Sequence, residues 1–322
     1  MPGDNGTVPP CPACAGGPLR RRYQLQYGAV WECPACRSAV TRFVDPDALR
    51  RANARWGDAD TARWRALAEA TERRHARSRL RALRRWQPQG QLLEIGPNRG
   101  EFLAAAADAG FHISATDLFD VLAPATRRRC AAIYPGDFLN CVIDQRFDAI
   151  AAFHVLEHVV DPRRFLQKAR DLLRPGGVLS IEVPNYDSLD RLLSGARWNM
   201  LFEYHVSHFS RHGLVALVES AGLSVCQLSS VTDPSRYLAG PYFRLRVGAW
   251  NALKHALRRP DGARGAKPYL ETAGAPRDRV VKTIVQTEWM ALRLLSIPLM
   301  PLAALQAGLG RGQVSRVIVR RS

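Results

Sequence analysis

Four cysteines near the start of the chain have the spacing of a metal site. Cys11 and Cys14 form one C-x2-C pair. Cys33 and Cys36 form a second pair, with eighteen residues between the two pairs. Each short pair can place two sulfurs on one side of a tetrahedral ion, so the pattern predicts a closed, structural four-thiolate zinc site. Four unrelated free cysteines are the alternative. The alternating residues 23–27 predict a strand of a small ribbon between the pairs.

Histidines are the second group of residues that could do chemistry. Neutral imidazole is the natural general base near pH 7, because its unperturbed pKa is about 6.5. Eight histidines are present, and four lie in two clusters near the ends of predicted strands: His154 with His158, and His205 with His208. His154 directly follows a predicted strand, at the edge where open α/β sheets bind their ligands. A structural hydrogen-bonding role is the alternative, and we favour it for His158.

A glycine turn follows the first apolar run of the central region. Residues 92–95 predict a buried strand, Gly96 and Gly100 bracket a tight turn, and 101–109 predicts a helix. Glycines let the backbone approach a ligand that a Cβ would push away. The dinucleotide pattern G-x-G-x-x-G is absent. Asn98 stands between the glycines and tolerates a left-handed backbone better than most residues do. An ordinary strand-to-helix turn is the alternative.

Strands and helices alternate through the rest of this region. Apolar runs predict strands at 111–116, 131–134, 147–153, 178–183 and 223–230, helices at 161–173 and 211–221, and a last edge strand at 314–319. Asp117 ends the second strand, 23 residues after Glu94, where a carboxylate can accept both hydroxyls of a ribose. Helix capping is its alternative. Asp137 follows the third strand, where a plain Gly-Asp turn competes with a ligand role. The pattern predicts an α/β, Rossmann-like sheet.

Three phrases of this region resemble class I S-adenosylmethionine (SAM) methyltransferases. The stretch from Glu94 to Gly100 resembles their first motif, acid-x-Gly-x-Gly-x-Gly, with Asn98 in the place of the middle glycine. Residues 154–162 (HVLEHVVDP) and 173–185 (LRPGGVLSIEVPN) resemble the saccharide-type branch of that family more specifically. The resemblance implies a class I methyltransferase sheet with SAM as its cofactor.

The same resemblance assigns roles in SAM binding. In the family, the first acid lies near the amino-acid end of SAM and the glycine turn passes beneath its methionine part. The second acid takes the ribose hydroxyls, the third bonds the adenine amino group, and an apolar neighbour covers the ring. The residues expected to bind SAM here are Glu94, Gly96, Asn98, Gly100, Asp117, Asp137, Phe138 and Phe153.

A general base is also implied by resemblance. Residues 204–210 resemble the Glu-His-x-Ser-Tyr-Phe phrase of sugar methyltransferases that carry an N-terminal four-Cys zinc module, in which the His is the base. His205 is therefore the first candidate for the base, and His154 is a second catalytic candidate that lines the pocket. Tyr204 replaces the acid before the His, so Glu203 is the nearest acidic candidate. Anchoring of the following helix is the alternative role of His205.

The length and composition set the domain organisation. A chain of 322 residues with 47% hydrophobic content suits one large globular domain with attachments. The predicted parts are a zinc ribbon at 1–44, a helical linker or lid at 45–89, a SAM-binding core at 90–235, a helical insertion at 236–310 and a last core strand at 311–322.

The net charge of +17 is large, and 42 of the 46 basic residues are Arg. It indicates either an anionic partner or a coding bias with a solvated basic surface, and the dispersal of the Arg residues favours the second. The start lacks a charged-then-apolar signal segment. The apolar stretch 294–309 holds two prolines and is shorter than the roughly 20 residues of a spanning helix. We expect a cytoplasmic protein, and 236–310 is the segment that we expect to make any peripheral contact with a membrane.

Together these features predict a SAM-dependent methyltransferase acting on a sugar or sugar-linked acceptor, such as a polysaccharide, a lipid-linked glycan or a natural-product sugar. An RNA methyltransferase is the first alternative, with the ribbon and the positive charge holding phosphates. Nucleic acid is disfavoured because Phe153-His154-Val155 stands where base-methylating enzymes often have an Asn/Asp-Pro-Pro-aromatic motif. A zinc-ribbon adaptor that has lost SAM is the second alternative, as Asn98 suggests.

Overall fold

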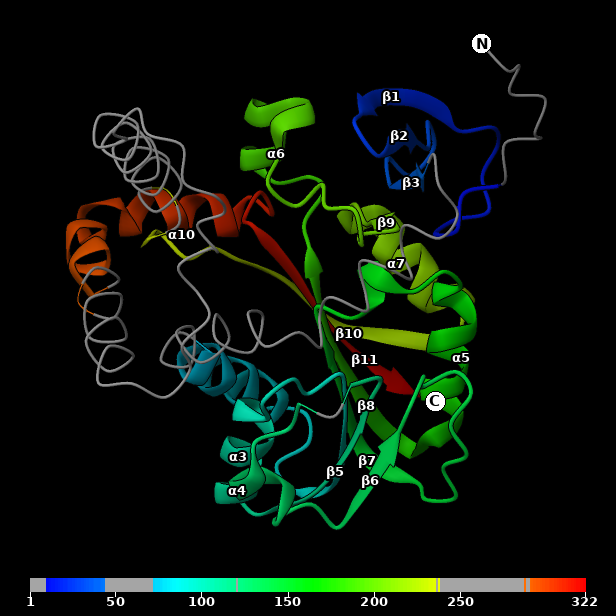
Figure 1. The fold of residues 1–322 in the computed structure, drawn as a ribbon, viewed down its shortest axis with the longest axis vertical. Helices are drawn as coiled ribbons and strands as arrows, with labels where there is room; N and C mark the ends of the chain where they lie inside the picture. The colour runs from blue at the N-terminus through cyan, green and yellow to red at the C-terminus, as the bar shows by residue number, and fades with distance from the viewer. Residues whose placement is uncertain (1–9, 44–71, 120, 236, 238–286, 288–289) are drawn as a thin grey trace, which may run out of the picture. The chain divides into compact units, whose positions relative to one another are not determined.

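Seven strands form the central sheet of the computed structural model, in the order β10-β11-β8-β7-β4-β5-β6 (Figure 1). The strands are β4 (Gly90–Ile95), β5 (Phe111–Asp117), β6 (Ala132–Pro135), β7 (Phe147–Phe153), β8 (Leu173–Pro184), β10 (Leu223–Val231) and β11 (Val314–Arg321). The five strands from β4 to β8 pair in parallel, whereas β11 is antiparallel to both of its neighbours. This is the Rossmann-like sheet that the sequence predicts, with one reversed strand.

The structure describes residues 10–43, 72–119, 121–235, 237, 287 and 290–322. They belong to two compact units, one of Met1–Val231 with Gln306–Ser322 and one of Thr232–Leu305. Most of the predicted linker at 45–89 and of the predicted insertion at 236–310 lies outside the described residues. Within the linker, residues 72–83 are described and form a helix.

Helices cover both faces of the sheet. Adjacent residues of a strand point to opposite faces, so Leu93 joins a core with α5 (Pro162–Leu172) and α7 (Arg211–Ser220). Leu92 joins a second core with α3 (Glu101–Asp108) and the helix at 72–83. Shorter segments are α4 (Pro124–Arg127), η1 (Leu156–His158), α6 (Leu189–Ser194), η2 (Gly195–Arg197), η3 (Ile297–Leu299) and α10 (Met300–Gly308). Two buried faces explain why the strands are apolar runs rather than alternating ones.

The prediction of β11 as an edge strand is wrong. β11 lies between β10 and β8 and pairs with both (Figure 1). Val317, Ile318 and Val319 are fully buried, because β11 contributes to the cores on both faces. β8 is also longer than predicted, since it begins at Leu173 and runs through Pro175-Gly176-Gly177, which the sequence suggests as a break.

The ribbon shares a strand with the core of the same unit. β1 (Arg20–Leu25), β2 (Gly28–Glu32) and β3 (Ala39–Phe43) form an antiparallel sheet, and β9 (Ser207–His208) extends it beside β3. The first strand begins earlier than the predicted 23–27. Val30 of the ribbon packs with Tyr186 and Trp198 of the core. The N-terminal module is therefore part of the structure that carries residues 198–210.

Exposed apolar side chains are frequent in one stretch of the chain, residues 290–309. Between Met290 and Leu309, eight large apolar side chains are exposed: Met290, Leu294, Leu295, Ile297, Met300, Leu302, Leu305 and Leu309. Among the described residues, no helix combines the length and the apolar character that crossing a bilayer requires.

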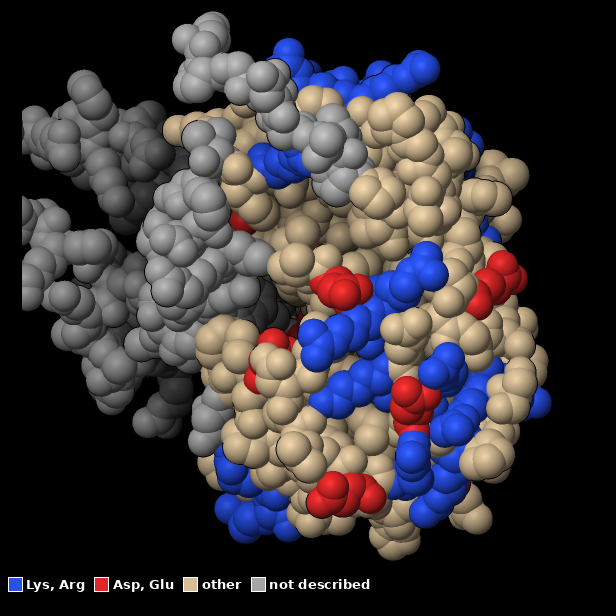
Figure 2. All heavy atoms as spheres, turned by 90° about the vertical axis from the view of Figure 1, so that its right-hand side faces the viewer, with Lys and Arg blue, Asp and Glu red and all other residues tan. Residues whose placement is uncertain are grey.

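Basic side chains are spread over the face that includes α5. Figure 2 shows Lys and Arg there in several groups, with Asp and Glu side chains beside them. An open hollow of about 550 Å³ on this protein is lined by Ile143, Asp144, Arg146, Arg164, Gln167, Lys168, Asp171 and Leu172. The hollow includes the residues that precede β7, so it lies toward the amino ends of the parallel strands, away from their ligand-binding edge.

Candidate functional site

The carboxyl ends of β4, β5 and β7 bring three predicted site residues to one edge of the sheet. Glu94 lies near the end of β4, Asp117 is the last residue of β5, and His154 follows β7. β4 is hydrogen-bonded to both other strands in parallel register, so their ends are neighbours. In open α/β sheets this edge is where ligands bind.

The turn after β4 has the backbone that a close ligand requires. Gly96, Asn98 and Gly100 have φ angles of 67°, 52° and 87°, all in the left-handed region. Asn98 takes the conformation that the sequence predicts for it. A Cβ added at Gly96 would lie 2.7 Å from Cγ2 of Val155, so a side chain there requires the neighbouring loop to move. The Oδ1 atom of Asn98 is buried and has no hydrogen-bond partner among the described residues.

Glu94 is a buried carboxyl group that lacks a complete set of partners. It is 4% exposed, and its Oε2 atom has no hydrogen-bond partner in the described part of the chain. Burial raises the pKa of Glu94 to about 8, against the opposing effect of the nearby Arg79 guanidinium. A buried carboxyl with an unused oxygen beside a glycine turn fits the ammonium end of SAM, because a cation would stabilise its charged form.

The other predicted SAM-binding residues also have local partners. Oδ1 of Asp117 accepts a hydrogen bond of 2.9 Å from the Phe119 amide. Asp137 is exposed, and its oxygens accept from the Leu139 amide at 2.9 Å and the Asn140 side chain at 3.1 Å. These contacts stabilise the turns that follow β5 and β6.

The two predicted aromatic residues differ in their surroundings. Phe138 is buried, and its ring lies 4.9 Å from the ring of Phe165 on α5. Phe153 lies at the carboxyl edge, where its ring meets Phe102 edge-on at 4.8 Å and the Arg79 guanidinium lies 4.5 Å above it. Both rings are therefore buried in the cores of the sheet, Phe138 on the α5 face and Phe153 on the α3 face.

An ion network that the sequence analysis missed borders this site. Glu182, near the end of β8, accepts from Arg79 Nε at 2.7 Å and from Arg316 Nε at 2.6 Å. All three side chains are buried. Burial disfavours the charge, but the two guanidinium groups outweigh it and lower the pKa of Glu182 to about 2. The network connects the helix at 72–83, β8 and β11, so it holds the helix against the site.

Replacing Glu182 by alanine is expected to destabilise the protein by about 3–5 kcal/mol, because the buried Arg316 loses the counter-charge of Glu182 and Arg79 is left with the more distant Glu72, at 3.6 Å. Urea unfolding followed by circular dichroism measures the change. Glu219 is an exposed glutamate on α7, and Glu219→Ala is the matched control with little expected effect. Equal stabilities of the two variants would contradict the structural role of the network.

His154 is a half-buried imidazole at this edge of the sheet. Its φ angle is 56°, its side chain is 34% exposed, and its Nδ1 lies 3.1 Å from Oε1 of Glu157. Glu157 is 1% exposed, and interactions with His154 and the other nearby histidines lower its pKa to about 2 despite its burial. The charged carboxylate accepts the Nδ1 proton, which leaves Nε2 of His154 as an acceptor.

His205 lies in the interior. It is 5% exposed, and its Nδ1 donates to the Met200 carbonyl at 2.8 Å. Burial lowers its pKa to about 4, so the ring is neutral near pH 7. His208 is also buried and bonds Thr41 of the ribbon at 2.8 Å. Glu203 is half-buried. Burial of Tyr27 raises the pKa of Tyr27, and the negative charge of Glu203 raises it further.

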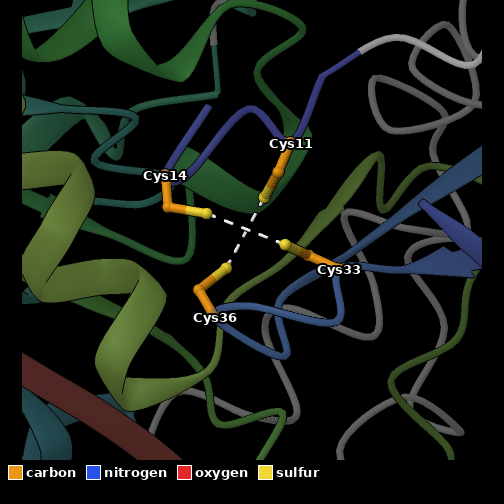
Figure 3. A group of neighbouring side chains, drawn as sticks. All are labelled: Cys11, Cys14, Cys33 and Cys36. Atoms are coloured by element: carbon orange, nitrogen blue, oxygen red, sulfur yellow. Dashed lines mark hydrogen bonds between the residues drawn. The ribbon is translucent and has the colours of Figure 1, made fainter. Parts of the chain in front are cut away.

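The four predicted metal ligands come together (Figure 3). The sulfurs of Cys11 and Cys36 are 3.5 Å apart, and those of Cys14 and Cys33 are 3.7 Å apart. All four lie within 4.8 Å of one another. Sulfurs on a tetrahedral zinc ion, with bonds of about 2.3 Å, are roughly 3.8 Å apart. The donor set and its spacing therefore fit zinc.

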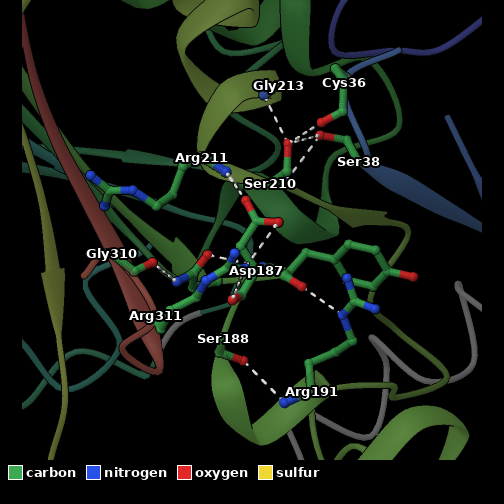
Figure 4. A network of polar contacts seen from close by, with 12 residues as sticks. Cys36, Ser38, Asp187, Ser188, Arg191, Ser210, Arg211, Gly213, Gly310 and Arg311 are labelled. Atoms are coloured by element: carbon green, nitrogen blue, oxygen red, sulfur yellow. Dashed lines mark hydrogen bonds and ion pairs between the residues drawn. The ribbon is translucent and has the colours of Figure 1, made fainter. Parts of the chain in front are cut away.

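A polar network joins the cysteine cluster to the start of α7 (Figure 4). Ser210 caps α7 by accepting from the Gly213 amide at 2.9 Å, and its hydroxyl donates to the Cys36 carbonyl. Ser38 accepts from the Ser210 amide at 3.1 Å. The segment that contains His205 is thus fixed at one end by the backbone of the cysteine knuckle. The residues joined by these two hydrogen bonds are 172 and 174 positions apart in the sequence, so no local sequence pattern could predict the bonds.

Comparison with known proteins places the chain in a family. The family described as a methyltransferase domain matches residues 67–228, and the chain belongs to it. The chain is 30% identical over 97 residues to the demethylmenaquinone methyltransferase of Clavibacter sepedonicus, covering 28% of this chain and 40% of that protein. It is 30% identical over 144 residues to the C-methyltransferase NovU of Streptomyces niveus, covering 42% and 33%. The chain thus spans less than half the length of these curated relatives.

Solved structures are similar to this chain at low sequence identity. Magnesium protoporphyrin IX methyltransferase (ChlM) from Synechocystis PCC 6803, with bound SAH, has a TM-score of 0.47 against this chain. The sequence identity is 11%, and the match covers 57% of this chain and 93% of that chain. Sheet order and family membership together define a class I SAM-dependent methyltransferase domain.

Proposed function

We propose that this protein transfers a methyl group from SAM to an oxygen or carbon atom of a sugar or sugar-linked acceptor. The observation that carries the proposal is one sheet edge with a left-handed glycine turn, an incompletely bonded Glu94 and an accessible His154. The sugar-linked acceptor rests on the resemblance of residues 154–162 and 173–185 to the saccharide-type branch. Curated relatives include both C- and O-methyltransferases.

The carboxylates at the sheet edge would hold the cofactor. SAM supplies an electrophilic methyl group on its sulfonium. Glu94 would pair with its ammonium group, Asp117 would accept the ribose hydroxyls, and Asp137 would accept from the adenine amino group. The missing side chains at Gly96 and Gly100 leave room for Val155, Leu122 and Thr126 to pack against the turn, which would pass beneath the ligand. Alignment of the acceptor accounts for much of the rate in such a displacement, since it removes translational freedom before reaction.

His154 is the general base in this proposal, in place of His205, which the sequence ranks first. His154 is exposed at the sheet edge and its Nε2 is an acceptor, because Glu157 takes the Nδ1 proton. It would remove the proton from a hydroxyl, or from a carbon next to a ketone. His205 is interior and is bonded to Met200. Its proposed part is to shape the floor beneath the acceptor, together with the neighbouring Tyr204.

The pH dependence of SAM binding is expected to follow Glu94. Its pKa of about 8 in the folded protein lies above the ordinary value of 4.5 for a glutamate, so the proton on Glu94 stabilises the fold below pH 4.5 and this stabilisation is lost as the pH rises through about 8. Pairing with the ammonium needs the charged form, so SAM affinity should fall by up to roughly tenfold per pH unit below that pKa.

Calorimetric titration of SAM at about pH 6 and about pH 8.5 checks this prediction, because these two pH values lie on either side of the pKa of Glu94. Glu94→Gln should bind SAM more weakly and lose the dependence on pH. Affinities that are equal at the two pH values in the unaltered protein would show that Glu94 does not pair with the ligand.

Transfer of a labelled methyl group tests the function as a whole. The protein is incubated with SAM labelled in its methyl group and a panel of nucleotide-linked sugars, lipid-linked sugars and RNA. Label in a sugar fraction supports the proposal. Label in RNA alone would establish the first alternative, and absence of saturable SAM binding would establish the adaptor without SAM.

We further propose that Cys11, Cys14, Cys33 and Cys36 hold a structural zinc ion. Four thiolates complete a tetrahedral shell and leave no position for a substrate. The role of the ion would be to fix the ribbon, and through Cys36 and Ser210 the start of α7.

A further inference from the structure

Glu157, His158 and His205 form a cluster beside the proposed base His154. One ligand atom of each residue lies within 4.8 Å of the other two. Glu157 and His205 are 1% and 5% exposed, and the imidazole rings of His158 and His205 are 4.8 Å apart. The residues come from η1 and from the segment before β9, so the fold assembles them from two places in the chain.

Backbone carbonyls fix the proton positions on both imidazoles. His158 Nδ1 lies 2.9 Å from the Tyr204 carbonyl oxygen, and His205 Nδ1 lies 2.8 Å from that of Met200. A carbonyl oxygen only accepts, so each Nδ1 carries a proton and donates it. In a neutral ring this leaves a lone pair on each Nε2.

Glu157 adds a third acceptor to the same cluster. Its Oε1 accepts from His154 at 3.1 Å, whereas its Oε2 is buried and has no hydrogen-bond partner among the residues that the structure describes. Lone pairs of two imidazoles and a carboxylate that converge with nothing between them would repel one another. A cation between them would turn this repulsion into attraction.

We propose that Glu157, His158 and His205 bind a divalent transition-metal ion of the Zn²⁺ type, separate from the four-cysteine site. Two imidazole nitrogens and a carboxylate oxygen are ligands that such ions prefer. Metal-binding histidines usually donate their second N–H to a carbonyl or carboxylate, as both do here. Ligands on a tetrahedral ion with bonds of about 2.0–2.1 Å are roughly 3.3 Å apart, so small side-chain rotations would close the site.

The ion would connect two segments that flank the proposed acceptor site. The backbone already joins them, because the Val206 amide donates to the Glu157 carbonyl at 2.8 Å. Three protein ligands leave at least one coordination position, which suits a water or an acceptor oxygen. Glu157 would then serve two partners, with Oε1 on His154 and Oε2 on the ion.

Metal stoichiometry of the full chain tests the proposal without an activity measurement. Protein saturated with Zn²⁺ and then desalted is expected to hold two equivalents by mass spectrometry, one for each site. His158→Gln and His205→Gln should each hold one. His112 is an exposed histidine outside the cluster, and His112→Gln is the matched control that should keep two.

Substitution with Co²⁺ distinguishes the two sites by their ligands. The thiolate site gives an intense charge-transfer band in the near ultraviolet, and this band should persist in His158→Gln while the second equivalent is lost. A single equivalent in the unaltered protein, with all cobalt on thiolates, would overturn the proposal, and a proton on one imidazole would then satisfy Glu157. This outcome is independent of whether any acceptor is methylated.

Discussion

Replacing His154 by alanine is expected to lower kcat by roughly 10²–10⁴-fold, the range that general base catalysis supplies. The dissociation constant of SAM should stay unchanged. His154 lies at the end of β7, 34% exposed, and its Nδ1 is held by the Glu157 carboxylate. This arrangement directs an unprotonated Nε2 away from Glu157 and toward the edge where the acceptor would bind. Steady-state kinetics with the acceptor found by label transfer, together with SAM calorimetry, check both parts.

Two further variants make this result specific. His205→Ala removes the base that the sequence ranks first, and it is expected to reduce kcat less than His154→Ala does. His112→Ala changes an exposed histidine far from the candidate catalytic residues in sequence and should leave kcat unchanged. If His205→Ala abolishes turnover while His154→Ala retains it, the base is His205, and its buried position in this structure must open when the acceptor binds.

The sequence predicts the parallel part of the sheet well because each strand there leaves a local signal. Residues 147–153 form β7 with the bounds expected from the apolar run, and Asp161 caps α5 as its place before Pro162 suggests. The left-handed turn through Asn98 is similarly local, since it depends on the backbone preference of one residue. These features need no knowledge of what packs against them.

Features that depend on distant pairing are not visible in the sequence. The alternation of β11 resembles that of an edge strand, and only the pairing of β10 on its outer side makes the strand central. Arg79 and Glu182 are 103 positions apart, and no pattern links them. The preference for His154 over His205 as the proposed base also depends on distant contacts. The resemblance points to His205 in the sequence, whereas the burial of His205 is known only from the fold.

Loss of the cysteine site is expected to disorder more than the ribbon. Structural zinc contributes on the order of 10–16 kcal/mol in zinc-finger peptides, comparable with the whole stability of a domain, about 5–15 kcal/mol. The ribbon is also packed on the core, since its buried Val30 contacts the cluster of Tyr186 and Trp198. The Cys36 carbonyl also accepts the hydroxyl that caps α7. Unfolding of the ribbon should therefore loosen residues 198–210.

Hydrogen exchange on Cys14→Ser tests this coupling. Amides of 28–43 and 198–210 are expected to exchange faster than in the unaltered protein, whereas amides of 90–103 should keep their protection, because β4 and α3 are held by the parallel sheet and its helices. Cys226 is a half-buried thiol on β10 outside the cluster, and Cys226→Ser is the matched control. Unchanged exchange at 198–210 in Cys14→Ser would show that the ribbon and the proposed acceptor site are energetically independent, although the hydrogen bond from the Ser210 hydroxyl to the Cys36 carbonyl joins them in the structure.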